Sequence, residues 1–236
     1  GEIGIVFQEP MTSLSPVHSI GNQIMEGILL HVTEDKEEAY DIALDMLTRV
    51  GIANPEQRLE EYPHQLSGGM RQRALIALAL ACQPNILIAD EPTTALDVTI
   101  EAQILDLMEH LQHQFDMSII HVTHDMGVIA EVSDYVAVMY LGRVIEYASV
   151  KDLFGNPLHP YTQALMRSIP RIGRRVTELE VIKGTVPRPI DLPEACGFYT
   201  RCPLMMEGLC DRAVPKMIEE EPGHFVACFN YGDQQE

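Results

Sequence analysis

Two neighbouring acidic residues follow a short apolar run in the first half of the chain. Residues 85–89 read Asn-Ile-Leu-Ile-Ala, and Asp90 and Glu91 come directly after them. A continuous apolar run of this length is typical of a buried strand in a parallel sheet. Open α/β sheets hold their ligands at the carboxyl ends of such strands. The spacing therefore delivers both carboxylates to an edge where ligands bind.

A serine–glycine stretch stands ahead of this strand, at Ser67-Gly68-Gly69. Serine is a favourable helix N-cap, and two glycines let backbone N–H groups approach a ligand closely. Free N–H groups at a helix N-terminus form a phosphate site. The Ala/Leu-rich run at residues 74–81 continues the predicted helix with small side chains that suit close packing. The stretch from 65 to 97 thus combines a phosphate-binding feature with two acids.

Alternating strands and helices are predicted to position these residues. Short apolar runs predict strands at residues 3–7, 85–89 and 118–122. Helical spacing of apolar residues predicts helices at residues 19–31, 36–50 and 99–115. Gly142 marks the turn of a short hairpin made of residues 136–141 and 143–146. This order of elements predicts an α/β fold.

The order of the motifs resembles the ATPase subunit of ABC transporters. The stretch from Leu66 to Met70 resembles the signature motif, residues 86–91 resemble Walker B with the adjoining catalytic glutamate, and residues 95–97 resemble the D-loop. Each piece alone is weak, because a serine before two glycines is usually a turn. The order and spacing together carry the resemblance. It implies a P-loop NTPase-like α/β fold with a helical signature subdomain.

The resemblance also implies roles for single residues. Asp90 would hold Mg²⁺ through water, and Glu91 would orient or polarise the attacking water. His124, which follows the strand at residues 118–122, would contact the γ-phosphate of ATP. Gln8, in the position of the Q-loop, would touch Mg²⁺ and the attacking water. Positioning and charge stabilisation would supply the catalysis.

Pairing of two ATPases is a further implication of the resemblance. ATP would lie between the P-loop of one subunit and Ser67, Gly68 and Gly69 of the other. Asp97 would link the two sites across the dimer. The partner is expected to be either an identical chain or a similar, distinct ATPase.

No Gly-x-x-x-x-Gly-Lys-Ser/Thr P-loop occurs in the 236 residues. That loop cradles the phosphates of ATP, and its lysine neutralises them. In the resembling family it precedes the Q-loop, and this chain starts at Gly1, in mid-motif. We therefore interpret the chain as an N-terminally truncated ATPase and expect no ATP hydrolysis by this fragment alone.

The C-terminal part resembles one subfamily in particular. The stretch from Asn156 to Thr162 reads Asn-Pro-Leu-His-Pro-Tyr-Thr, which is similar to the C-terminal extension of oligopeptide and dipeptide importers. Nickel importers of the same group share it. The sequence thus predicts an ATPase domain at residues 1–148 and a small, loop-rich extension at residues 149–236.

Four of the five cysteines lie in this extension, in the pattern C-x5-C-x7-C-x17-C: Cys196, Cys202, Cys210 and Cys228. Four thiols in a short, loop-rich segment suggest a metal or cluster site, and a reducing cytosol disfavours disulfides. The spacing differs from that of a zinc ribbon. It resembles the cysteine tail that holds a 4Fe–4S cluster in some dipeptide and oligopeptide ATPases. Zinc and free thiols remain the alternatives.

The net charge of −19 argues against nucleic acid as a partner, since phosphates would repel the chain. It also argues against direct adsorption to anionic lipid. No apolar run approaches the roughly 18–20 residues that span a bilayer. The charge is therefore interpreted as a solubility feature.

The resemblance implies that the parent protein powers import of oligopeptides or dipeptides as an ATP hydrolase. It would work with two transmembrane permease subunits, and indirectly with an extracytoplasmic peptide-binding protein, at the cytoplasmic face of the inner membrane. Nickel import is the alternative within the subfamily. A soluble ABC ATPase is disfavoured by the His-Pro-Tyr-Thr tail, and a redox protein with a vestigial ATPase part is disfavoured by intact Asp90, Glu91 and His124.

Overall fold

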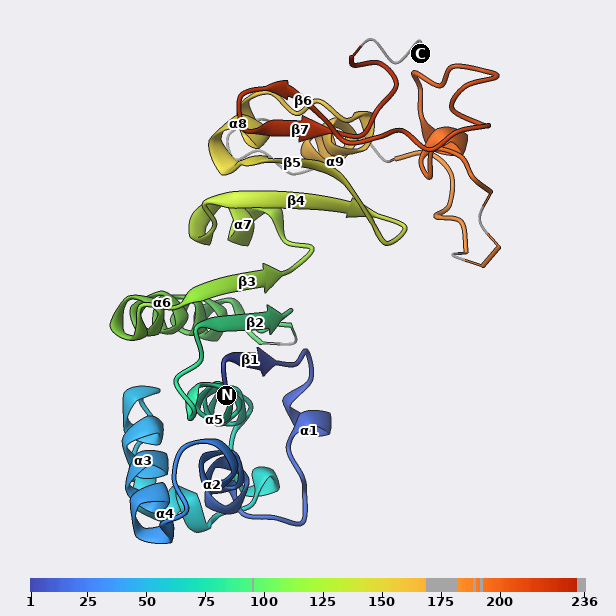
Figure 1. Cartoon of the computed structure of the whole chain (residues 1–236). Helices are drawn as coiled ribbons and strands as arrows, with labels where there is room; N and C mark the ends of the chain where they lie inside the picture. Colours follow the sequence, from blue (N-terminus) through green and yellow to red (C-terminus); the bar gives the residue numbers. More distant parts are fainter. Residues whose placement is uncertain (95, 169–181, 189, 192, 233–236) are drawn as a thin grey trace. The chain divides into compact units, whose positions relative to one another are not determined.

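The computed structural model describes residues 1–94, 96–168, 182–188, 190–191 and 193–232 (Figure 1). The chain divides into two compact units, Gly1–His124 and Asp125–Glu236. Each unit is described by itself below. Among the described residues, no helix is both long enough and apolar enough to cross a membrane.

A three-stranded parallel sheet forms the centre of the first unit, with strand order β1-β2-β3. The strands are β1 (Ile3–Val6), β2 (Ile86–Asp90) and β3 (Ser118–Val122), as the apolar runs predicted. Figure 1 shows them side by side, and Ile86 of β2 is in register with Ile3 and with Ser118. All three strands therefore end at the same edge of the sheet, where the candidate site lies.

Only one face of this sheet is fully covered by the described residues. Val6, Leu87 and Ala89 are buried, whereas Ile5 and Ile120 are 41% and 51% exposed. The apolar runs had predicted strands buried on both faces. The strands alternate instead, because the helices of this unit contribute their buried side chains to a single core on one side of the sheet.

Helices of the first unit begin and end where the sequence predicted, with side-chain caps at several N-termini. Ser19 accepts a hydrogen bond from the backbone N–H of Asn22, and Gly51 follows α3 with φ of +73°. The predicted helices at 19–31, 36–50 and 99–115 are confirmed within one residue at each end. The elements are α1 (Pro10–Ser13), α2 (Ile20–His31), α3 (Lys36–Arg49), α4 (Pro55–Glu60), η1 (Pro63–Gln65), α5 (Gly68–Leu80) and α6 (Val98–Phe115).

The signature helix α5 packs closely on β1. A Cβ atom added at Gly4 would lie 2.5 Å from the backbone oxygen of Ala79, so the strand needs glycine at this point. Buried Leu75 and Ile76 of α5 join Val6 and Leu87 in the core. This contact fixes the position of α5 against the sheet.

An antiparallel sheet with strand order β4-β5-β7-β6 forms the centre of the second unit. Leu141 and Gly142 link β4 to β5 with φ of +47° and +75°, the left-handed conformation that tight hairpin turns require. The predicted hairpin around Gly142 is therefore confirmed. The elements are α7 (Met126–Val132), β4 (Tyr135–Tyr140), β5 (Arg143–Ser149), α8 (Val150–Gly155), α9 (Pro160–Ser168), η2 (Tyr199–Arg201), β6 (Ile218–Glu221) and β7 (His224–Val226).

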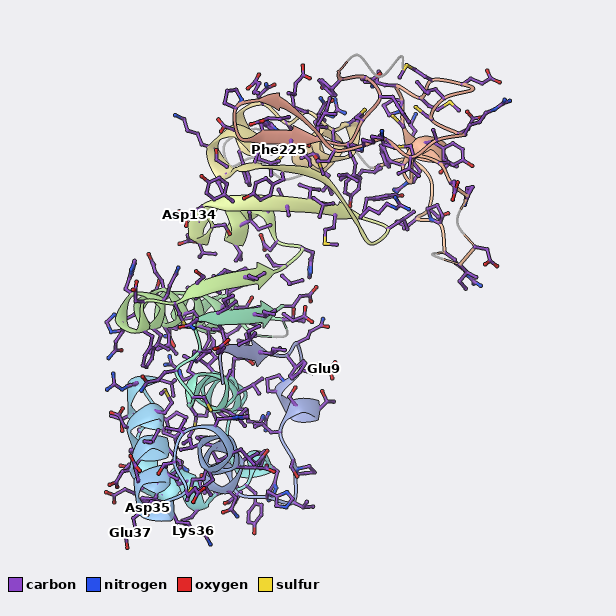
Figure 2. All side chains as sticks on the ribbon, viewed as in Figure 1. Glu9, Asp35, Lys36, Glu37, Asp134 and Phe225 are labelled. Carbon is purple, nitrogen blue, oxygen red and sulfur yellow. The ribbon has the colours of Figure 1, made fainter. Side chains whose placement is uncertain are left out.

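The hairpin that the sequence assigned to the ATPase domain shares its sheet with the C-terminal tail. β5 pairs with β7, with Glu146 opposite Val226 and Tyr147 opposite Phe225. Figure 2 labels Phe225 on β7 and Asp134 just before β4. The two compact units thus do not coincide with the predicted domains 1–148 and 149–236, and that domain division stays a prediction. The expected loop-rich extension also contains a pair of strands, β6 and β7, and β7 pairs in addition with β5, which lies nearly 80 residues earlier in the chain.

A fully buried carboxylate holds the Asn-Pro-Leu-His-Pro-Tyr-Thr segment to this sheet. Glu146 of β5 accepts hydrogen bonds from the backbone N–H groups of Leu158 at 2.7 Å and His159 at 2.9 Å. The Nε2 atom of His224, on β7, lies 2.8 Å from the same carboxylate. Buried polar groups are costly unless they are hydrogen-bonded, so these three contacts stabilise the second unit.

Replacing Glu146 by Gln should destabilise the second unit by about 2–4 kcal/mol. The amide NH₂ cannot accept from an N–H group, so at least one of the three donors loses its partner. Hydrogen exchange at the Leu158 and His159 amides should accelerate in Glu146→Gln and stay unchanged in Glu220→Gln, which alters an exposed glutamate of β6. Equal exchange rates in the two variants would contradict this role of Glu146.

Candidate functional site

Glu91 occupies a strained position directly after β2. Its φ is +44°, a left-handed conformation that non-glycine residues seldom adopt. Its backbone N–H donates to the carbonyl oxygen of Val122 at 2.8 Å, and its own carbonyl accepts from the N–H of Thr94 at 3.1 Å. Such backbone strain occurs at functional sites when the surrounding structure fixes it. The hydrogen bond to Val122 attaches the loop after β2 to the end of β3.

Three side chains converge on the carboxylate of Glu91. Gln8 Nε2 donates to Oε2 at 2.7 Å, Thr94 Oγ1 donates to the same oxygen at 2.8 Å, and His124 Nδ1 lies 2.9 Å from Oε1. Gln8 follows β1 and His124 follows β3, so residues beyond all three strand ends meet here. Figure 2 labels Glu9, the neighbour of Gln8, at the point where β1 gives way to α1.

Hydrogen bonding sets the electrostatics of this cluster. The hydrogen bond from His124, followed by that from Thr94, holds the pKa of the Glu91 carboxyl below its usual range, and the hydrogen bond from Gln8 adds a smaller effect. The His124 side chain is 81% exposed and that of Glu91 is 23% exposed. Glu91 therefore presents an ionised carboxylate that solvent and a ligand can reach.

Asp90 and Asp97 flank this cluster in sequence but have different surroundings. Asp90 is the last residue of β2, and no side-chain hydrogen bond or ion pair to it occurs within the described ranges. Its carboxylate is therefore available to a cation such as Mg²⁺, which prefers oxygen ligands. Asp97 caps α6, because its Oδ1 atom accepts from the N–H of Ile100 at 3.0 Å.

The serine–glycine stretch opens helix α5, whereas the residues of the Glu91 cluster follow strands. Ser67 caps α5 by accepting from the N–H of Met70 at 3.3 Å, as predicted. A Cβ atom at Gly68 would meet open space, whereas one at Gly69 would lie 3.3 Å from Ile100. In the described part of the chain, these residues form no hydrogen bond with Gln8, Glu91 or His124. Ser67 and Gly68 are exposed and Gly69 is half-buried, so a ligand has access to this helix N-terminus.

Thr94 is a site residue that sequence reasoning missed. It lies three residues after Glu91, and its own N–H closes the turn by donating to the carbonyl of Glu91. The turn brings the Thr94 hydroxyl within hydrogen-bond distance of the Glu91 carboxylate. The neighbouring Thr93 donates to Glu101 of α6 at 2.8 Å, which ties this turn to the helix. Two adjacent threonines after Asp-Glu-Pro were the available signal, but a threonine pair in a loop is too common to assign a role.

The structure places the four tail cysteines near one another without forming a metal site. Cys210 and Cys228 are buried, and the N–H of Met206 donates to Cys210 Sγ at 3.4 Å. Burial raises the pKa of the Cys228 thiol to about 11, and the charges of the other three thiols add to this shift. Within the described ranges, however, no three His, Cys, Asp or Glu side chains are grouped so that they could hold a metal ion. The arrangement of these thiols thus does not support the predicted 4Fe–4S cluster or its zinc alternative.

Comparison with known proteins identifies the class of protein that this fold and site define. Residues 1–94 match the family model described as ABC transporter. The dimeric ATP-binding cassette MJ0796, solved in a post-hydrolysis state with ADP and Pi, has a TM-score of 0.55 and 29% sequence identity. The alignment covers 63% of this chain and 63% of that one. The chain is therefore an ABC-type ATPase with the P-loop NTPase fold.

The C-terminal part of the chain identifies the family within the ABC-type ATPases more closely. Residues 145–210 match the model described as Oligopeptide/dipeptide transporter, C-terminal region. The oligopeptide transport ATP-binding protein AppD of Bacillus subtilis is 51% identical, over 99% of this chain and 71% of its own length. The dipeptide transport ATP-binding protein DppD of the same organism is 49% identical, over 97% of this chain and 68% of its own length. The chain belongs to the ATP-binding subunits of oligopeptide/dipeptide ABC transporters.

Removing the imidazole of His124 should raise the pKa of the Glu91 carboxyl, since the hydrogen bond from His124 is the largest cause of the lowered pKa. We expect a smaller rise in Thr94→Val and the smallest in Gln8→Ala. Carbon-detected NMR of labelled glutamate side chains in His124→Ala measures this, with His113→Ala on an exposed position of α6 as the control. A Glu91 titration that matches the control would show that the hydrogen bond is not formed in solution.

Proposed function

We propose that this chain supplies the hydrolytic site of the ATPase that drives peptide import. The convergence of Gln8, Glu91 and His124 beyond three parallel strands carries the proposal, because a water-polarising carboxylate must be held at the ligand edge of the sheet. AppD and DppD are named for oligopeptide and dipeptide transport, which supports peptides rather than nickel as the cargo.

In the proposed mechanism, Glu91 orients the attacking water by accepting its proton in a hydrogen bond. Asp90, whose carboxylate has no partner in the described part of the structure, would hold Mg²⁺, which would supply positive charge beside the phosphates. His124 is exposed enough to reach the γ-phosphate. Gln8 and Thr94 both donate to Oε2, so a water that uses this oxygen must displace one of these two donors or bridge to it.

A second ATPase subunit completes the proposed site. Ser67 and Gly68 are exposed and Gly69 is half-buried, which suits contact with a nucleotide held by a partner. The dimeric state of MJ0796 supports this arrangement. Asp97 would connect the two sites. The proposed assembly includes two transmembrane permease subunits and receives peptide from an extracytoplasmic binding protein, at the cytoplasmic face of the inner membrane.

We also propose that Cys196, Cys202, Cys210 and Cys228 take up a metal centre, with a 4Fe–4S cluster ahead of zinc. The support is that each thiol lies within electrostatic range of the others. The thiols would have to move together from their present places, since no three of them are grouped for a metal now. Such a centre would cross-link the tail of a small unit and stabilise it.

Exchanging Glu91 for Gln should stall hydrolysis and leave ATP binding intact. The experiment uses an ATPase that carries this chain behind a P-loop segment, assembled with its permease partners. We expect the rate to fall on the order of 10²-fold or more, because the water loses its acceptor while Asp90 still holds Mg²⁺. Glu109→Gln, on the exposed face of α6, is the matched control. Near-normal turnover in Glu91→Gln would exclude Glu91 as the catalytic base.

The four-cysteine proposal predicts a coloured protein after anaerobic purification. A 4Fe–4S cluster would give broad absorbance near ~400 nm and about four irons per chain. Cys210→Ser should remove the colour, whereas Cys82→Ser should not, because Cys82 lies in the first unit beside the carbonyl of Gly27. A colourless protein that contains stoichiometric zinc would show that the four cysteines bind zinc and not a 4Fe–4S cluster. Four freely titrating thiols in the native protein would exclude any metal.

A further inference from the structure

The second unit contains a cavity that the ATPase mechanism does not use. Its volume is about 430 Å³, within the range of roughly 300–1,000 Å³ that small-molecule sites occupy. It lies between the β4–β5 turn and two segments of the tail, and all of its lining residues belong to the second unit. It is therefore separate from the Glu91 cluster.

Apolar and aromatic side chains form most of the cavity wall. Phe198 is almost fully buried, and its ring packs edge-on against Tyr140 and Tyr161 with centroid distances of 5.4 Å in both cases. These contacts hold the Phe198 ring in place, so this wall is formed before any ligand arrives. Ile145 and Val214 extend the apolar surface. Such a lining favours a ligand with aliphatic or aromatic groups.

His159 supplies a buried hydrogen-bond donor to the cavity. It is 2% exposed, and its Nδ1 atom accepts from the backbone N–H of Tyr161 at 3.0 Å. Burial lowers the pKa of this imidazole to about 4, so the ring is neutral at pH 7 and carries its proton on Nε2. No acceptor for Nε2 occurs among the residues that the structure describes. A ligand carbonyl would satisfy this donor.

Two opposite charges complete the lining. Arg143 and Glu194 both line the cavity, both have exposed side chains, and neither forms an ion pair within the described ranges. A ligand with only a negative charge would be attracted by Arg143 and repelled by Glu194, and a purely cationic ligand would meet the reverse. A molecule that carries both charges interacts favourably with both residues.

We propose that this cavity binds a short apolar peptide with free termini. Arg143 would hold its carboxylate, Glu194 its ammonium group, and the His159 imidazole a peptide carbonyl, while Phe198 and Val214 contact its side chains. Charge-assisted hydrogen bonds are stronger than neutral ones, so the contacts of Arg143 and Glu194 with the two termini should contribute most of the affinity. Binding here is independent of the Glu91 site, and its failure would leave the proposed role in ATP hydrolysis untouched.

Calorimetric titration of the whole chain with the dipeptide leucyl-phenylalanine tests the proposal. We expect one peptide per chain. The uncharged N-acetyl, C-amide form should bind at least about tenfold more weakly, because each lost charge-assisted contact has a cost of that order. Arg143→Gln and Glu194→Gln should each weaken binding of the free dipeptide about tenfold. Arg212→Gln and Glu220→Gln, which remove exposed charges that do not line the cavity, should leave the affinity unchanged.

A cavity-filling variant locates the site. Val214→Trp places a large side chain at the wall, so it should abolish binding while the circular dichroism of the chain stays the same. Three results would overturn the proposal: no binding of the free dipeptide at millimolar concentration, equal affinity for the capped form, or binding that survives Val214→Trp. Weakening in Arg212→Gln equal to that in Arg143→Gln would also overturn it, since net charge rather than the cavity would then be responsible.

Discussion

One backbone hydrogen bond determines where the carboxylate of Glu91 lies. The N–H of Glu91 donates to the carbonyl of Val122, one position beyond the regular ladder between β2 and β3. This bond holds Glu91 at a positive φ, which turns its side chain back toward residues that follow β1 and β3. A parallel sheet aligns its strand ends, so Gln8 and His124 reach the same carboxylate from either side. The site is therefore a consequence of strand register together with one strained residue.

The second unit depends on a carboxylate of a different kind. Glu146 is fully buried, and two of its three partners are backbone N–H groups that cannot move away while the fold persists. It joins β5, β7 and the segment at Leu158 and His159, three parts of the chain that are distant in sequence. The His-Pro-Tyr-Thr motif is thus explained by structure: its first residue is held by Glu146, and its imidazole lines the adjoining cavity.

The features that the sequence predicted correctly are those that a local pattern of residues specifies. Periodicity located the helices and strands of the first unit, and motif order located Asp90, Glu91 and His124 at strand ends. The sequence pattern did not predict contacts between residues that are distant along the chain. Pairing of β7 with β5 depends on residues nearly 80 positions apart, and Glu146 looked like an ordinary strand residue. Four cysteines in a short tail predicted a metal centre, but thiol count does not specify convergence, which depends on how the intervening loops fold.

The two carboxylates differ in a way that follows from their roles. Glu146 has neighbours that fully exclude water, so its hydrogen bonds contribute to stability and leave no acceptor for a ligand. Glu91 is held by three side chains, each of which can rotate away, and it stays open to solvent. A group that must receive a proton from water needs partners that are replaceable within the catalytic cycle. The exposed, side-chain-bound carboxylate therefore suits catalysis, and the buried, backbone-bound one suits folding.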